Sequence, residues 1–326
     1  MKVLVTGGAG YVGSHTCKAL ARAGHEPVVY DNLSTGHRWA VKWGPCVVAD
    51  IADPATLEAA LRDHRIDAVI HFAGSCYVEE SIRDPMKYFR NNVLGSEVLL
   101  ESMMRCGVEK IIFSSSCAVY GVPDAVPIAE DHPTRPINPY GESKLVVEKM
   151  LRWLGETKGL RWIALRYFNA AGADADGEIG ESHEPETHLI PLAIKAAAGG
   201  DYRLSIFGTD HPTPDGTAIR DYVHVSDLAT AHLLALQSLD LNSANGAVNL
   251  GAGNGTSVRE VIKLVEKITG AKVRYTDADR RTGDPPELVA DIAKVQSFLN
   301  WTPPRSSLSA IVEDAWRWHR SRHRGD

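Results

Sequence analysis

The stretch Val3-Leu-Val-Thr-Gly-Gly-Ala-Gly-Tyr-Val-Gly13 decides the fold of this chain. Residues 2–6 form a short β-branched and leucine run, which predicts a buried parallel strand. The run stops at Gly7, Gly10 and Gly13, which open a helical pattern. Glycines in a tight strand-to-helix turn let backbone N–H groups meet a pyrophosphate at the helix N-terminus. The stretch therefore predicts a dinucleotide-binding turn.

An acidic residue follows where such a turn requires one. The helical pattern ends at Gly24, and residues 27–30 form a second strand-like run that is closed by Asp31. A carboxylate at this place can accept both ribose hydroxyls of an adenosine, and it repels a 2′-phosphate. We therefore expect NAD rather than NADP, with the small polar residues of the loop 32–36 on the adenosine side.

Strands and helices alternate through the first half of the chain. Strand-like runs lie at 46–49, 68–72, 110–113 and 162–168, and helical patterns lie at 54–64, 85–107 and 139–155. This alternation predicts an α/β fold with a doubly wound parallel sheet (Rossmann), whose ligands lie beyond the strand C-termini. We expect an NAD-binding domain at 1–170 and a second, smaller C-terminal substrate domain at 171–326, with 221–250 returning to the first.

Composition narrows the class of protein. The 326 residues are 44% hydrophobic and 23% charged, with a net charge of −6. Such a balance argues against nucleic acid or an anionic membrane as the main partner. We see neither a run apolar enough to span a bilayer nor a signal peptide, and the five cysteines are scattered. We expect a cytoplasmic protein with reduced thiols.

The segment His183-Glu-Pro-Glu-Thr-His188 superficially resembles a metal-binding cluster. It is not the His-Glu-x-x-His motif, because position 187 is Thr, and Pro185 would interrupt the helix that such a motif needs. We expect a polar loop and no metal.

Tyr140 and Lys144 lie four residues apart in a helical pattern, so that both side chains share one helix face. A tyrosine that acts as a base near pH 7 needs its pKa of ~10 lowered by about three units. A nearby ammonium and a positively charged nicotinamide both favour the phenolate. Ser116, at the end of the preceding strand, can hydrogen-bond the same substrate oxygen. The three residues predict a proton-transfer site for a hydroxyl that is being oxidised.

The chain resembles the extended short-chain dehydrogenase/reductases from Met1 to about Trp318. The resemblance is carried by residues 6–13, 31–32, 71–74, 91–93, 114–121, 140–144 and 166–169, and by the more specific segments 207–208, 217–225 and 280–284. It implies tightly held NAD⁺ and a UDP-hexose whose C4 is transiently oxidised, which interconverts UDP-glucose and UDP-galactose. It also implies a homodimer built from the helices at 86–104 and 140.

The turn, the catalytic set and the resemblance together give the candidate site residues. Catalytic residues are Ser116, Tyr140 and Lys144. Expected cofactor contacts are Gly7, Gly10, Tyr11, Val12, Gly13, Asp31, Asn32, Ser34, Thr35, Gly36, Asp50, Ile51, Phe72, Ala73, Gly74, Asn91, Tyr140, Lys144 and Phe168. Expected substrate contacts, as the resemblance implies, are Ser116, Tyr140, Asn169, Leu189, Phe207, Arg220, Arg281, Asp284 and Leu288.

Two positions depart from the family pattern. Cys76 stands where well-known members carry a lysine near the cofactor phosphates, and His188 stands where some members carry asparagine. Leu288 occupies a variable position where a bulky aromatic is thought to limit room beside the C2 substituent of the sugar. Because leucine is smaller than tyrosine, we expect weaker turnover of the N-acetylated sugars beside the main pair, unless Leu288 is simply a core leucine.

Two other functions stay open at this point. Sugar-nucleotide 4,6-dehydratases and decarboxylases share the turn and the Tyr/Lys pair, but they carry acidic residues after the serine, where this chain has Cys117-Ala118-Val119. A non-catalytic NAD-binding regulator can share the fold, but it need not keep Ser116, Tyr140 and Lys144.

Overall fold

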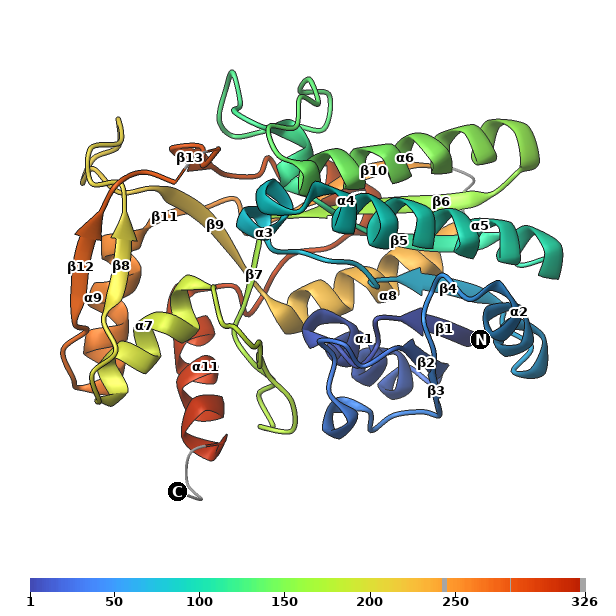
Figure 1. Cartoon of the computed structure of the whole chain (residues 1–326), viewed down its shortest axis with the longest axis horizontal. Helices are drawn as coiled ribbons and strands as arrows, with labels where there is room; N and C mark the ends of the chain where they lie inside the picture. The colour runs from blue at the N-terminus through green and yellow to red at the C-terminus, as the bar shows by residue number, and fades with distance from the viewer. Residues whose placement is uncertain (242–244, 282, 323–326) are drawn as a thin grey trace.

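The computed structural model describes residues 1–241, 245–281 and 283–322. Figure 1 shows a larger lobe built on a central sheet and a smaller lobe that holds α7, α9 and α11. Within the described ranges, no helix is both long and apolar enough to cross a membrane.

The described residues place seven parallel strands in the central sheet, in the order β10-β6-β5-β4-β1-β2-β3. The strands are β1 (Lys2–Thr6), β2 (Glu26–Asp31), β3 (Cys46–Val48), β4 (Ala68–His71), β5 (Lys110–Ser116), β6 (Arg161–Tyr167) and β10 (Gly246–Leu250). Their order reverses direction between β1 and β4, so that a ligand crevice opens beyond their C-termini. The predicted doubly wound parallel sheet is confirmed.

Helices cover both faces of this sheet. One face packs against α2 (Pro54–Asp63), α5 (Gly95–Cys106) and α6 (Pro139–Lys158). The other packs against α1 (Tyr11–Arg22), α8 (Val225–Leu241) and α10 (Ala293–Leu299). Short 3₁₀ helices lie at η1 (Arg38–Ala40) and η3 (Cys117–Tyr120). The strands are apolar on both faces because neither face meets water.

The predicted helix at 85–107 is interrupted. It consists of α4 (Pro85–Tyr88), a π-helical stretch η2 (Phe89–Leu94) and α5, and it follows α3 (Val78–Arg83), which was not predicted. Asn92 within η2 is buried, and its Nδ2 donates to Ser143 Oγ at 2.9 Å and to the Ser75 carbonyl at 3.0 Å. The π-helical stretch thus places the Asn92 amide between the segment after β4 and α6. Short π-helical stretches often lie at functional sites.

The smaller lobe has its own core and two small sheets. One contains β7 (Asn169–Ala171), β9 (Ile219–His224), β11 (Gly255–Ser257) and β13 (Glu287–Leu288), and the other pairs β8 (Leu204–Phe207) with β12 (Tyr275–Ala278). Its core contains residues from α7 (Leu189–Ala198), α9 (Val258–Thr269) and α11 (Leu308–Arg322). The domain boundary at residue 171 stays a prediction. Residues of α8, β10 and α10 pack into the core of the large sheet, although they follow that boundary in the sequence.

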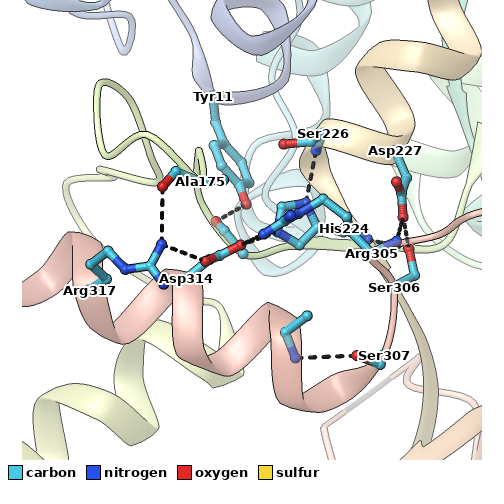
Figure 2. A network of polar contacts seen from close by, with 12 residues as sticks. Tyr11, Ala175, His224, Ser226, Asp227, Arg305, Ser306, Ser307, Asp314 and Arg317 are labelled. Atoms are coloured by element: carbon cyan, nitrogen blue, oxygen red, sulfur yellow. Dashed lines mark hydrogen bonds and ion pairs between the residues drawn. The ribbon is translucent and has the colours of Figure 1, made fainter.

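A network of polar contacts around the buried Asp314 fastens α11 to the end of β9 (Figure 2). The Asp314 carboxylate accepts from Arg305 at 2.6 Å and from Arg317 at 2.9 Å, and it lies 3.2 Å from His224 Nε2. The Ser226 backbone N–H donates to His224 Nδ1, so that the imidazole proton sits on Nε2 and faces Asp314.

Candidate functional site

The glycine-rich turn is shaped by contacts that admit no side chain. Gly7 has φ +70°, and a Cβ there would lie 2.6 Å from the Ala73 backbone nitrogen. A Cβ on Gly13 would lie 2.2 Å from the Gly7 carbonyl oxygen. The turn therefore presses against the segment after β4 while α1 starts directly above it. Such a cradle at a helix N-terminus fits a dinucleotide pyrophosphate.

Asp31 closes β2 beside this turn. Its carboxylate accepts from the Ala9 backbone N–H at 3.0 Å and from that of Leu33 at 2.8 Å. Burial raises the pKa of Asp31, and these two hydrogen bonds oppose the rise. A Cβ on Gly36 would lie 2.9 Å from Asp31 Oδ1, so that glycine keeps the carboxylate accessible from the loop. The placement fits an adenosine ribose.

One cavity of about 1390 Å³ joins the turn to the smaller lobe. Every candidate site residue named from the sequence lines it except Asp50. Asp50 is exposed and accepts from Asn32 Nδ2 at 2.9 Å, so that it positions a lining residue. The candidates thus meet in one space, although they come from the two lobes.

Tyr140, Ser116 and Lys144 meet in this cavity from two elements. Ser116 ends β5, and Tyr140 lies in the first turn of α6, which Asn138 caps through Gly141 N at 2.8 Å. Burial and the Cys76 thiol raise the pKa of Tyr140, whereas a hydrogen bond with Ser116 opposes the rise. The chain's own groups therefore keep Tyr140 protonated near neutral pH.

Lys144 lies one helical turn beyond Tyr140. Its Nζ donates to the Ser114 carbonyl at 2.8 Å and lies 5.9 Å from the centre of the Tyr140 ring. Burial lowers the pKa of Lys144 to about 8. The Lys144 Nζ thus lies over the Tyr140 ring, and its lowered pKa is typical of a group in a proton-transfer site.

The smaller lobe supplies cationic and aromatic groups to the opposite wall. Arg220 pairs with Asp284 and also donates to the Pro285 carbonyl at 2.7 Å. The Arg281 guanidinium lies 4.0 Å from the centre of the Phe207 ring. Arginines fit a diphosphate bidentately, and an aromatic ring can stack on a base.

Leu288 both lines the cavity and belongs to a core cluster with Phe168, Leu145 and Val119. Its Cα pairs with that of Arg220 between β13 and β9. Leu288 therefore packs in the core and also borders the cavity.

Some lining residues were not named from the sequence as site residues. Tyr167 donates to the hydroxyl of Ser114, the residue whose carbonyl contacts Lys144. Tyr77 also lines the cavity. Glu181, His183 and Glu186 line it together with His188. The strand-end position of Ser114 was a usable signal, whereas nothing local marks residues 181–186 as neighbours of the glycine turn.

Comparisons with known proteins agree with this geometry. The model of the NAD dependent epimerase/dehydratase family matches residues 3–251. The UDP-glucose 4-epimerase of Azospirillum brasilense is 51% identical over 321 residues, which cover 98% of this chain and 92% of the relative.

Two solved structures are similar over nearly the whole chain. One is the UDP-glucose 4-epimerase from Brucella ovis in complex with NAD, with a TM-score of 0.94, 52% identity and 97% of each chain covered. The other is the UDP-glucose-4-epimerase from Stenotrophomonas maltophila with bound NAD and formylated UDP-arabinopyranose, with a TM-score of 0.96, 42% identity and 100% of each chain covered.

Proposed function

Because this chain belongs to the NAD dependent epimerase/dehydratase family, we propose that it interconverts UDP-glucose and UDP-galactose by transient oxidation at sugar C4. The observation that carries the proposal is the meeting of Ser116, Tyr140 and Lys144 in a cavity that the glycine turn also lines. Relatives with the name UDP-glucose 4-epimerase match over nearly all of the chain, which supports the same function.

The residues present fit NAD as the resident cofactor. Gly7, Gly10 and Gly13 would supply the pyrophosphate cradle, Asp31 would accept the adenosine ribose hydroxyls, and Lys144 would bind the nicotinamide ribose. NAD⁺, when bound, supplies an acceptor for the C4 hydride and returns it, so that no cofactor is consumed overall.

Tyr140 takes the proton from the sugar O4, and Ser116 holds that oxygen by a hydrogen bond. Since burial raises the pKa of Tyr140, the phenolate needs positive charge nearby. Lys144 supplies one such charge, and the nicotinamide cation adds a second. Tyr140 later returns the proton to O4 when the 4-keto sugar is reduced on its other face.

The smaller lobe anchors the part of the substrate that does not react. We propose that Arg220 and Arg281 hold the diphosphate, that Phe207 receives the uracil, and that Asn169, Leu189 and Asp284 complete the contacts. Anchoring of the nucleotide lets the 4-keto hexose rotate and present its other face while the nucleotide stays in place. Cys117 and Ala118 follow Ser116 without a carboxylate, which disfavours elimination at the same site.

Two measurements test the proposal. Denaturation of the protein should release NAD, which mass spectrometry would identify. Incubation of the native protein with UDP-galactose should give UDP-glucose without added cofactor. Formation of a stable 4-keto-6-deoxy sugar or of carbon dioxide would contradict it.

We further propose a cytoplasmic homodimer. All five cysteines lie within the described residues and are free thiols, as expected in a reducing compartment. Ile82, Met86 and Leu94 are 44%, 54% and 46% exposed on the α3–α5 segment, and Trp153 on α6 is 57% exposed. These helices run side by side along one edge of the larger lobe (Figure 1), which suits an isologous helical interface.

A further inference from the structure

Four metal-ligating side chains converge in the wall of the cavity, although their segment is not helical. We call Glu181, His183, Glu186 and His188 the 181–188 cluster. One ligand atom from each of the four residues lies within 4.8 Å of the others. From the sequence alone we expect a polar loop without metal, because position 187 is Thr and Pro185 would interrupt the helix that a His-Glu-x-x-His motif needs. The fold brings the same residues together by another route.

The distances within the cluster suit a small tetrahedral ion. His183 Nδ1 lies 3.2 Å from Glu181 Oε1 and 3.5 Å from Glu186 Oε2. His188 Nδ1 lies 2.8 Å from Glu181 Oε1 and 2.9 Å from Glu186 Oε1. Ligands at about 2.0–2.1 Å from a tetrahedral zinc ion lie roughly 3.3 Å from one another. Small adjustments of side chains would admit the ion.

Two atoms of the cluster lack the hydrogen bonds that burial demands. Glu181 Oε1 and His183 Nδ1 are buried, and neither makes a well-aligned hydrogen bond among the described residues, although both lie at ion-pair distance from other members of the cluster. The Glu181 side chain is only 5% exposed. The two atoms are close, yet they are not aligned as donor and acceptor. Buried polar atoms of this kind call for an occupant such as an ion or a water molecule.

The surroundings hold these ligands in place. The His183 ring meets the Tyr11 and Tyr77 rings edge to face, with centroids 6.1 Å and 6.2 Å away. The backbone of the segment is tied on two sides, since Trp318 donates to the Glu181 carbonyl at 2.8 Å and His37 Nε2 lies 2.7 Å from the Ser182 carbonyl. Ligands fixed in this way lose little freedom on binding a metal.

A second group of carboxylates in the molecule provides a contrast. Asp174, Asp176 and Glu178 also place carboxylates close together. There the Lys18 ammonium already lies among them, at 2.7 Å from Asp174, 2.9 Å from Asp176 and 2.5 Å from Glu178. Within the described residues, the members of the 181–188 cluster form ion pairs only with one another, and no lysine or arginine lies among them.

We propose that Glu181, His183, Glu186 and His188 bind one divalent zinc-class ion. Two imidazoles and two carboxylates are the donors that zinc accepts, whereas magnesium and calcium prefer oxygen alone. The ion would fasten the segment 181–188 beside Tyr11 of the glycine turn and Leu189 of α7. Its role is to hold the cavity wall, and it takes no part in the proposed hydride and proton transfers.

Protons compete with the metal for this site. Tyr11, Tyr77 and Cys76 also face the cluster. A histidine binds a metal through a neutral imidazole nitrogen, so that zinc affinity should fall as the pH is lowered.

The test uses the full-length protein loaded with Zn²⁺ and then passed through a desalting column. Elemental analysis should find one zinc per chain, and zinc titrations should show an affinity that falls as the pH is lowered. His183→Ala and Glu186→Gln should each weaken zinc affinity by more than roughly 100-fold, because loss of a ligand exceeds loss of an outer-shell partner. Asp176→Asn, in the contrasting cluster, should bind zinc as the parent does.

Co²⁺ provides a second readout that needs no variant. The Co²⁺-loaded parent should show the intense visible absorption of a tetrahedral site. Absence of stoichiometric zinc in the parent, an octahedral Co²⁺ spectrum, or equal zinc affinity in folded His183→Ala would overturn the proposal. These outcomes leave the proposed epimerisation untouched, because none of them measures turnover.

Discussion

At the scale of single residues, the proposed reaction depends most directly on the Tyr140 hydroxyl. Tyr140→Phe removes one hydroxyl and keeps the partly buried ring, so that the fold and NAD retention should survive. The chemical step should slow by at least ~10²-fold, which is the usual contribution of a positioned acid-base group. Single-turnover conversion of UDP-galactose measures the loss.

The control for Tyr140 is the NAD content of the same preparation. Parent and variant should release equal amounts of NAD on denaturation. Near-normal turnover in Tyr140→Phe would show that another group takes the O4 proton.

Leu288 tests the specificity of the sugar pocket. Leu288→Tyr fills the edge of the cavity and should suppress turnover of UDP-N-acetylgalactosamine more than that of UDP-galactose. A hydrophobic wall discriminates one small group by ~1–3 kcal/mol, so that the change in the ratio of kcat/KM should be about 10- to 100-fold.

Leu288→Met is the matched control, because it nearly conserves side-chain volume in the core cluster around Phe168. Its ratio of kcat/KM should equal that of the parent. An unchanged ratio in Leu288→Tyr would mean that this residue does not gate the sugar.

At the scale of elements, Asp314 fastens α11 to the junction of β9 and α8. Burial raises the pKa of Asp314, but hydrogen bonds from His224 and Arg305 outweigh it, and the net pKa is lowered. A lowered carboxyl pKa stabilises the fold above the unfolded pKa, and this stability is lost as the pH falls through the folded pKa. Asp314→Asn should therefore cost about 2–4 kcal/mol at pH 7.

Urea unfolding at several pH values measures this contribution. The difference between parent and Asp314→Asn should stay constant from pH 8 to about 5 and shrink below that. Glu313 lies next to Asp314 and accepts an exposed hydrogen bond from Ser309, so that Glu313→Gln should change stability by less than ~0.5 kcal/mol. A difference that grows in acid would contradict the assigned direction.

At the scale of the whole molecule, the exposed apolar side chains of α3 to α6 predict the mode of association. In an isologous dimer, Met86→Glu with Leu94→Glu would bring like charges from both copies together. The parent should sediment as a dimer at micromolar concentration, and the double variant should sediment as a monomer.

Tyr275 on β12 offers a control in the other lobe, because it is 40% exposed outside the proposed interface. Tyr275→Glu should leave the dimer intact. A monomeric parent would contradict the proposal directly.

The sequence by itself determined the features that depend on local chemistry. Residues 2–6 form β1 as predicted, and Gly7 adopts the positive φ that its turn requires. Ser257 closes the capping box that opens α9, and Asn138-Pro139 starts α6. Period, caps and turns act within a few residues, so that they can be read without the fold. The spacing of Tyr140 and Lys144 belongs to the same class.

Only the tertiary structure decided which distant segments meet. β9 pairs with β7, β11 and β13, and these short strands gain their stability from partners far away in the sequence. The π-helical break at Phe89–Leu94 depends on where Asn92 finds Ser143. The cofactor contact of Asp50 stays a prediction, and only the fold shows that Asp50 accepts a hydrogen bond from Asn32. The 181–188 cluster likewise forms because Tyr11, Trp318 and His37 hold its loop, and no local pattern encodes contacts over such separations.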